Sequence, residues 1–188
     1  MKVYVGGING SGKTTILKEV AKQLGFEYIQ LTHLMMEALG FPFDYDKLRI
    51  TPEVEKTKVR EEILAKLLSD NDRNIIIDSH YLNLIKGKTN IVNGPAIAKF
   101  DILVLISAPV EQIWQRIYED QKTRDRALFP DNFTSEESFQ MLTKYQEDTA
   151  QEFSRLASTY HKKNIEIINV DGELESSIAK LVNFIGQS

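Results

Sequence analysis

The segment Gly7-Ile8-Asn9-Gly10-Ser11-Gly12-Lys13-Thr14 constrains this chain more than any other feature. It matches G-x-x-x-x-G-K-[ST] in full, directly after an apolar run at residues 2–5 and at the start of a helical pattern at 13–24. In this context the glycines let the backbone curl around an anion, with N–H groups and a helix N-terminus directed at it. The alternative is a glycine-rich turn that binds nothing. The motif therefore predicts a strand, a phosphate-binding loop and a helix.

Four further apolar runs alternate with helical patterns along the 188 residues, at 26–31, 74–77, 102–106 and 165–170. The third and fourth of the five runs are apolar at consecutive positions, which is typical of strands covered on both faces. Strand–helix alternation throughout predicts an α/β three-layer fold with a mostly parallel sheet.

The expected helices carry recognisable start signals. Thr51 and Pro52 predict an N-cap and a first helical residue for a helix that runs to about Leu68. Apolar residues at helical spacing predict a helix over 109–122, and another closes the chain. Thr134 and Glu137 predict a capping box that opens a long helix.

Two segments fit the alternation poorly, namely residues 32–68 and 123–133. Both are expected to lie over the edge where parallel strands end, which is where α/β folds bind ligands. Within the first segment we expect a short helix at 34–39 and a non-helical stretch at 44–49.

Composition excludes several function classes. The chain has no cysteine, which excludes disulfides, thiolate nucleophiles and Cys-ligated zinc. The net charge of −4 excludes a globally basic nucleic-acid binder, although a local basic cleft stays open. The three histidines have no metal-binding spacing, and no apolar run reaches the roughly 18–20 residues that span a bilayer. No targeting segment is recognisable, so we expect a cytoplasmic protein with no nucleic acid or membrane among its partners.

The loop residues have distinct chemical roles. Lys13 is placed to reach the β- and γ-phosphates of a nucleotide, and the Thr14 hydroxyl to ligate Mg²⁺. Asp78 ends the third apolar run, where a carboxylate can hold Mg²⁺ or its waters; capping the turn before Ser79 is the alternative. The guanine-reading N-K-x-D and the transporter signature L-S-G-G-Q are both absent, which leaves small kinases and stand-alone ATPases.

Arginines favour phosphoryl transfer. Arg116 lies off the apolar stripe of its helix, and Arg124 and Arg126 follow in the polar segment. Guanidinium groups on a closing loop would neutralise the transferring phosphoryl group and exclude water. The alternative is a solvated charged loop.

The first poorly fitting segment supplies candidates for an acceptor site. Arg49 and Arg60 are placed to bind an acceptor phosphate, although Arg60 could equally be an exposed helical arginine beside two glutamates. Thr32 and His33 follow the second strand and could touch an acceptor base or ribose; capping the short helix is the alternative.

With these features together, the chain resembles the nucleoside monophosphate kinases, most closely the archaeal type of adenylate kinase. The similarity rests on four pieces in order: the loop with Thr15 after it, Ile76-Ile77-Asp78-Ser79-His80, Lys86-Gly87-Lys88 followed by Gly94-Pro95, and the Arg116 helix running into Thr123-Arg124-Asp125-Arg126. Asn9 stands where that family usually has proline.

The resemblance implies a P-loop NTPase fold with a five-stranded core, helices on both faces, an acceptor-binding lobe at 32–68 and a short lid at 123–133. It implies Mg²⁺-ATP bound at residues 7–15, an acceptor contact from His80, and Arg116, Arg124 and Arg126 closing on the phosphates. Some archaeal relatives are trimers, so a homo-oligomer is compatible with the resemblance.

The function expected from the sequence is therefore reversible transfer of a phosphoryl group from Mg²⁺-ATP to AMP. A phosphate acceptor needs no strong general base, and the sequence shows no obvious base–nucleophile pair. One alternative is a kinase for another small acceptor, such as CMP, a deoxynucleotide or an alcohol, with Asp78 as the base for the alcohol. The other is a nucleotide-dependent assembly factor with ATPase activity.

Overall fold

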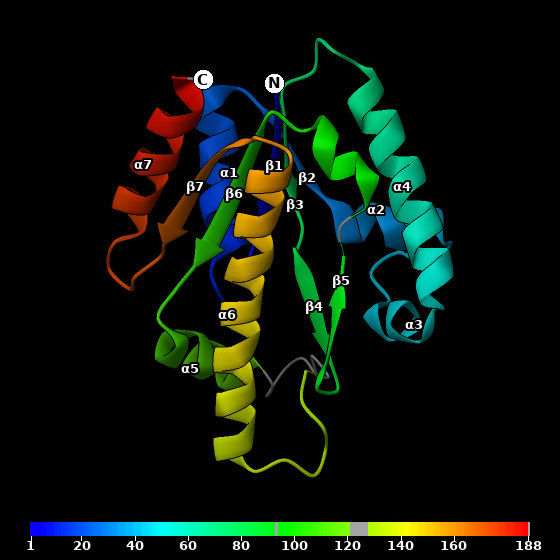
Figure 1. The fold of residues 1–188 in the computed structure, drawn as a ribbon, viewed down its shortest axis with the longest axis vertical. Coiled ribbons are helices and arrows are strands. Elements are labelled where there is room, and N and C mark those ends of the chain that lie inside the picture. The colour runs from blue at the N-terminus through cyan, green and yellow to red at the C-terminus, as the bar shows by residue number, and fades with distance from the viewer. Residues whose placement is uncertain (93, 121–127, 188) are drawn as a thin grey trace.

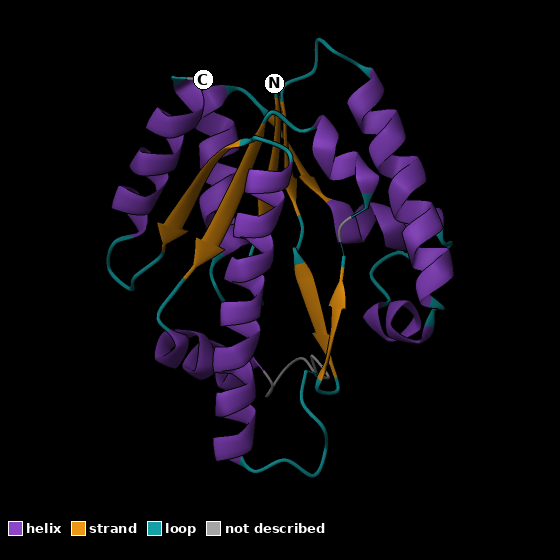
Figure 2. Ribbon diagram, viewed as in Figure 1, coloured by secondary structure: helices purple, strands orange, loops and turns teal. Residues whose placement is uncertain are grey.

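The computed structural model describes residues 1–92, 94–120 and 128–187. Its central feature is a parallel sheet in the order β2-β3-β1-β6-β7 (Figures 1 and 2). The strands of this sheet are β1 (Lys2–Gly6), β2 (Glu27–Gln30), β3 (Ile75–Asp78), β6 (Ile102–Ser107) and β7 (Lys163–Ile168). The predicted three-layer fold and its five-stranded core are confirmed.

Helices cover both faces of the sheet, as Figure 1 shows. Their bounds are α1 (Lys13–Leu24), α2 (Leu31–Ala38), α3 (Tyr45–Ile50), α4 (Glu53–Ser69), α5 (Val110–Asp120), α6 (Ser135–Thr159) and α7 (Leu174–Gly186), with a 3-10 turn η1 at Pro95–Lys99. Within the described ranges, none of these helices has the length and apolar character needed to cross a membrane.

Alternate residues of the central strands pack into two cores. Val3, Val5 and Ile76 point to the face covered by α1 and α7. Tyr4 and Ile77 point to the opposite face, against side chains of α4 and α6. Because both faces are buried, the strands must be apolar at every position, as the sequence indicated. Burying each such aliphatic side chain contributes about 1.5–3 kcal/mol relative to leaving it exposed.

The helix start signals behave as expected, with one small shift. Thr134 and Glu137 form the predicted capping box, and the Thr134 hydroxyl accepts from the backbone N–H of Glu137. The helix expected to begin at Pro52 begins instead at Glu53, with Pro52 in the capping position.

Of two local expectations in the segment 32–68, one is wrong and the other is confirmed with an earlier helix start. The stretch expected to be non-helical forms α3, because the Asp44 side chain accepts from the Lys47 backbone N–H at 3.0 Å and caps the helix. The short helix expected at 34–39 is α2, which starts at Leu31, directly at the end of β2.

A hairpin was not anticipated. Strands β4 (Leu82–Ile85) and β5 (Lys88–Ile91) pair antiparallel across a two-residue turn. Lys86 and Gly87 in that turn have φ of 45° and 78°, which matches a type I′ hairpin turn. Lysine in place of the usual asparagine hid this signal in the sequence.

Candidate active site

The phosphate loop joins β1 to α1 at the carboxyl edge of the sheet. Two of its glycines are required by close approach of other groups. A Cβ on Gly7 would lie 2.1 Å from the Ile106 carbonyl oxygen, and one on Gly12 would lie 2.3 Å from Asn169 Nδ2. Gly12 also has a left-handed conformation, with φ of 84°, at the N-cap of α1. The sequence of the loop is therefore matched to its surroundings as well as to an anion.

Side chains from β7 and α5 brace the outside of the loop. Asn169, buried directly after β7, donates from Nδ2 to the Ser11 carbonyl at 2.9 Å. Arg116 donates to the Gly10 carbonyl at 2.9 Å and pairs with Asp171. Sequence reasoning missed Asn169, although a polar residue at the carboxyl end of the last strand is the kind of signal that identified Asp78.

Lys13 reaches back across the loop that precedes it. Its Nζ donates to the carbonyl oxygens of Gly7 at 2.8 Å and Ile8 at 3.0 Å, and its side chain is buried. The ammonium group is therefore held over the mouth of the loop, where phosphate oxygens could replace the carbonyls as stronger, charge-assisted acceptors.

Asp78 meets the start of α1 and the end of β2. Its Oδ2 accepts from the Thr14 hydroxyl at 2.9 Å and from the Tyr28 hydroxyl at 2.7 Å. Burial first, and then the neighbouring Asp78, raise the pKa of Tyr28 well above its usual value, so the phenol stays protonated and donates. A carboxylate and a hydroxyl side by side are oxygen ligands of the kind that Mg²⁺ takes together with substrate phosphates. This donor set fits the predicted ion.

His80 closes the turn after β3. Its Nδ1 lies 2.8 Å from the Gly7 carbonyl oxygen. Since a carbonyl only accepts, Nδ1 carries the proton in this contact. Below this turn Tyr4 donates to the His80 carbonyl at 2.7 Å, and burial raises the pKa of Tyr4 to about 12. The buried tyrosine thus fixes the backbone that presents His80.

The segment 32–68 contributes the opposite wall of the site. Thr32 and His33 lie in the first turn of α2 and line the cavity; its capping position is Gln30, which makes no side-chain cap bond, so they do not have the alternative capping role. His33 Nε2 lies 2.8 Å from the hydroxyl of Tyr45 on α3. Arg49, also on α3, lines the cavity and pairs with Asp46 at 2.5 Å.

Helix α4 turns two cations toward the cavity. Arg60 is 5% exposed, donates from Nη1 to the Val92 carbonyl at 3.0 Å, and lies 3.5 Å from Glu53. It is not the exposed helical arginine that its neighbours Glu61 and Glu62 would suggest. Lys56, one turn earlier, is buried and lies 2.8 Å from Glu53. Sequence reasoning missed Lys56, whose spacing of four from Arg60 was the available signal.

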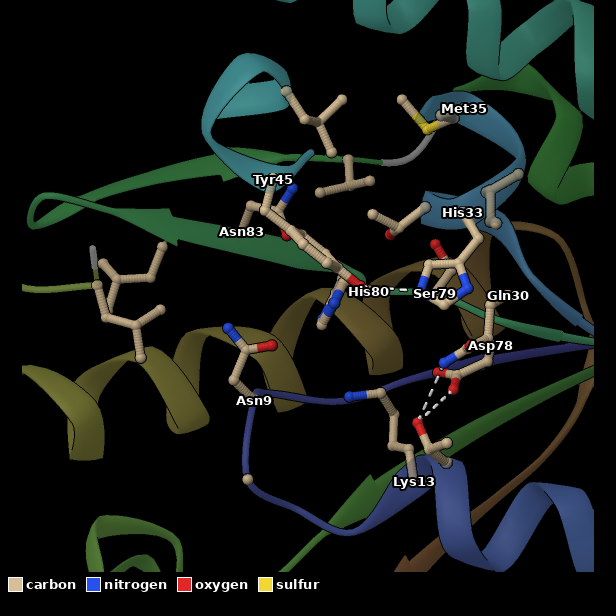
Figure 3. A pocket seen from close by; sticks show the side chains of 18 of the residues that line it. Asn9, Lys13, Gln30, His33, Met35, Tyr45, Asp78, Ser79, His80 and Asn83 are labelled. Atoms are coloured by element: carbon tan, nitrogen blue, oxygen red, sulfur yellow. Dashed lines mark hydrogen bonds between the residues drawn. The ribbon is translucent and has the colours of Figure 1, made fainter. Parts of the chain in front are cut away.

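Groups from both walls border one cavity of about 470 Å³, whose lining does not include Tyr4, Tyr28, Glu53 or Asn169. Figure 3 shows Lys13 and Asp78 pointing into it from one side, and His33 and Tyr45 from the other. Every predicted acceptor residue lines it, with Lys13, Thr14 and Arg116 at its phosphate-loop end. Its lining includes Asn9, Gly10, Gly12, Lys13, Thr14, Thr15, Thr32, His33, Tyr45, Arg49, Lys56, Arg60, Asp78, His80, Arg116 and Asp120. Its size is that of a small-molecule site.

Two predicted residues cannot be placed. Arg124 and Arg126 lie outside the described residues, as does most of the basic part of the segment 123–133. Arg116 is held by Gly10 and Asp171, so its expected role at the phosphates stays a prediction.

Comparison with known proteins identifies the family. A family model described as an AAA domain matches residues 6–135, about two thirds of the chain, and this match includes the phosphate loop, Asp78 and Arg116. The chain belongs to this AAA domain family.

Relatives of this AAA domain protein carry kinase names. The adenylate kinase of Methanothermobacter thermautotrophicus is 29% identical over 95% of this chain and 96% of its own length. The adenylate kinase isoenzyme 6 homolog of Caenorhabditis elegans is 26% identical over 61% of this chain and 57% of its own length. The resemblance to the nucleoside monophosphate kinases, and with it the prediction of a phosphotransferase, is confirmed.

Solved structures confirm the fold of the family member. The shikimate kinase of Acinetobacter baumannii, in complex with shikimate, has a TM-score of 0.69 and 20% identity, covering 98% of this chain and 92% of its own. The shikimate kinase of Bacteroides thetaiotaomicron has a TM-score of 0.68 and 15% identity, covering 98% and 97%. At these identities the likeness concerns the P-loop kinase fold and not the acceptor.

Proposed function

We propose that the protein is an adenylate kinase, which transfers the γ-phosphoryl group of Mg²⁺-ATP to AMP and gives two ADP. The observation that carries the proposal is a single cavity with cationic groups at both ends: Lys13 at the phosphate loop, and Arg49, Lys56 and Arg60 at the opposite wall. A second cationic end is what an acceptor that carries a phosphate requires, and the resemblance to a full-length adenylate kinase agrees with it.

In this proposal ATP binds along residues 7–15, with Thr14 and Asp78 holding Mg²⁺. The ion would neutralise charge on the transferring phosphates. Lys13 would exchange its loop carbonyls for phosphate oxygens, and the buried N-terminus of α1 would direct its N–H groups at them. Preorganised positive charge and alignment, and not proton abstraction, would supply the rate acceleration.

The segment 32–68 is the acceptor-binding lobe of this proposal. Arg49, Lys56 and Arg60 bind the AMP phosphate, while Thr32 and His33 lie where its base or ribose would be placed. Lys56 and Arg60 both pair with Glu53 on α4, and its half-exposed carboxylate offsets their positive charge. An incoming phosphate would compete with Glu53 for both cations, because charge-assisted bonds to a dianion are the stronger ones.

The site is less well suited to an alcohol as phosphoryl acceptor. It would need Asp78 as its base, but Oδ2 of Asp78 already accepts from two hydroxyl groups. In this proposal its other oxygen, Oδ1, would be taken by Mg²⁺, so neither oxygen would be left to accept a proton from an alcohol. The segment 123–133, with Arg124 and Arg126, completes the proposal as a short lid over ATP.

The sharpest test supplies ADP and Mg²⁺ alone. An adenylate kinase converts two ADP into ATP and AMP in equal amounts, measurable by chromatography, whereas a kinase for an alcohol cannot turn over without its acceptor. Forward assays with ATP plus AMP, CMP, dAMP or shikimate then rank acceptors. Lys13→Met serves as the control for a contaminating kinase. No ATP or AMP from ADP, with phosphorylation of another acceptor, would refute the assignment to AMP.

A further inference from the structure

Tyr28 lies beside the predicted magnesium site, on strand β2, which carries none of the predicted site residues. In the register of β2 with β3, Tyr28 is opposite Ile76, and Asp78 is opposite Gln30. Tyr28 and Asp78 are therefore diagonal neighbours on one face of the sheet. The same face is covered by α1, which brings Thr14 to Asp78.

Both hydroxyl groups donate to one oxygen of the carboxylate. Thr14 and Tyr28 bond to Oδ2 of Asp78, at 2.9 and 2.7 Å. Across the described ranges 1–92, 94–120 and 128–187, no residue donates to Oδ1. Two donors on one oxygen fix the rotation of the carboxylate and leave its other oxygen available.

The proton of Thr14 is also directed by this arrangement. A hydroxyl has one proton and two lone pairs. The Gln30 amide donates to the Thr14 oxygen at 3.5 Å, so a Thr14 proton that points at Asp78 leaves one further lone pair for a cation. The Thr14 proton keeps this direction only while the Asp78 carboxylate stays in place. The Tyr28 hydroxyl on β2 is the second donor that holds that carboxylate. Outer ligands of this kind typically change metal affinity or activity by about 10–100-fold when they are removed.

We propose that Tyr28 is a positioning residue of the magnesium site: its hydroxyl orients the Asp78 carboxylate, and through it the Thr14 hydroxyl, for the ion that accompanies ATP. This inference rests on the proposed function, in which Thr14 and Asp78 hold Mg²⁺. Tyr28 itself touches neither the ion nor the nucleotide.

The chain offers variants that isolate the hydroxyl. Tyr28→Phe keeps the ring that packs against the α1 and α7 core and removes only the donor. Tyr145→Phe is the matched control, because the buried Tyr145 hydroxyl donates to the Leu82 carbonyl at 2.8 Å and makes no contact with Asp78. Asp78→Asn tests the metal site directly.

The test measures equilibrium binding of ATP by calorimetry, once with excess Mg²⁺ and once with EDTA, for the full chain and these variants. The quantity compared is the dissociation constant of ATP in EDTA divided by that in Mg²⁺. We expect Tyr28→Phe to reduce this ratio about tenfold, with little change in the dissociation constant measured in EDTA. Asp78→Asn should reduce it as well, and Tyr145→Phe should leave it unchanged. Thermal unfolding without nucleotide shows that each variant is folded.

The failures are distinguishable. If Asp78→Asn reduces the ratio but Tyr28→Phe does not, or if Tyr28→Phe weakens binding equally with Mg²⁺ and EDTA, the positioning role is overturned and the proposed function stands. If the unaltered chain binds ATP no better with Mg²⁺, both the metal site and the inference that depends on it are overturned.

Discussion

Gly12 and Gly25 lie at the two ends of α1 and separate two reasons for which a glycine is needed. Both have left-handed backbones, with φ of 84° and 67°. A Cβ on Gly25 would meet nothing within 4 Å, whereas one on Gly12 would lie 2.3 Å from Asn169 Nδ2. Replacing each by alanine therefore adds the same backbone strain, but only Gly12→Ala adds a collision.

The expected loss in the free energy of unfolding follows from these contacts for each variant. Left-handed backbone costs an alanine about 1–2 kcal/mol, so Gly25→Ala should lower the free energy of unfolding by about that amount. Gly12→Ala must also move the buried Asn169 amide and break its bond to the Ser11 carbonyl, which adds about 1–3 kcal/mol. We expect a total of about 2–5 kcal/mol for Gly12→Ala.

Urea denaturation of the nucleotide-free chain measures both values, and a double-mutant cycle identifies the cause. In an Asn169→Ala background the amide is gone, so Gly12→Ala should cost only the backbone strain, with a coupling energy of about 1–3 kcal/mol. The reasoning is refuted if Gly12→Ala and Gly25→Ala cost the same, or if the cost of Gly12→Ala is unchanged in the Asn169→Ala background.

Three further predictions concern activity. Lys13→Met should fold normally and lower kcat about 10²–10³-fold in steady-state assays, as for loss of one preorganised charge; unchanged turnover would contradict its role. Arg49→Ala should raise KM for AMP more than KM for ATP, while Lys47→Ala, which removes an exposed cation from the same helix, should change neither; equal effects on both substrates would remove Arg49 from the acceptor site. Arg124→Ala and Arg126→Ala should each lower kcat at least about tenfold with little change in the dissociation constant of ATP; a matching loss of ATP affinity would make them ground-state binders.

The sequence predicted the central sheet well because its signals are local. A strand buried on both faces must be apolar at consecutive positions, and Ile75–Ile77 can do little else. The phosphate loop is equally local, since eight consecutive residues carry both its conformation and its chemistry. Asp78 was found because the end of a buried strand fixes where its side chain lies.

The residues that were missed depend on contacts between distant segments. Tyr28 reads as an ordinary strand aromatic, and only the β2–β3 register places its hydroxyl on Asp78. Asn169 acquires its role from Ser11, 158 positions earlier in the chain. Lys56 and Arg60 were hard to assign because α4 buries cations on the face where helices usually bury aliphatic side chains.

Net charge gives the clearest example of a global property that hides a local one. The chain as a whole carries −4, which alone would argue against polyphosphate ligands. Yet five arginine or lysine side chains and only two aspartates border the cavity, among the residues that the structure describes. A cleft with walls of low dielectric concentrates the field of such groups, so the local sign decides which ligands enter. Most of the described acidic residues that set the net charge are exposed, where solvent screens them from this site. A P-loop kinase can therefore be acidic overall and still attract phosphate-bearing ligands into its cleft.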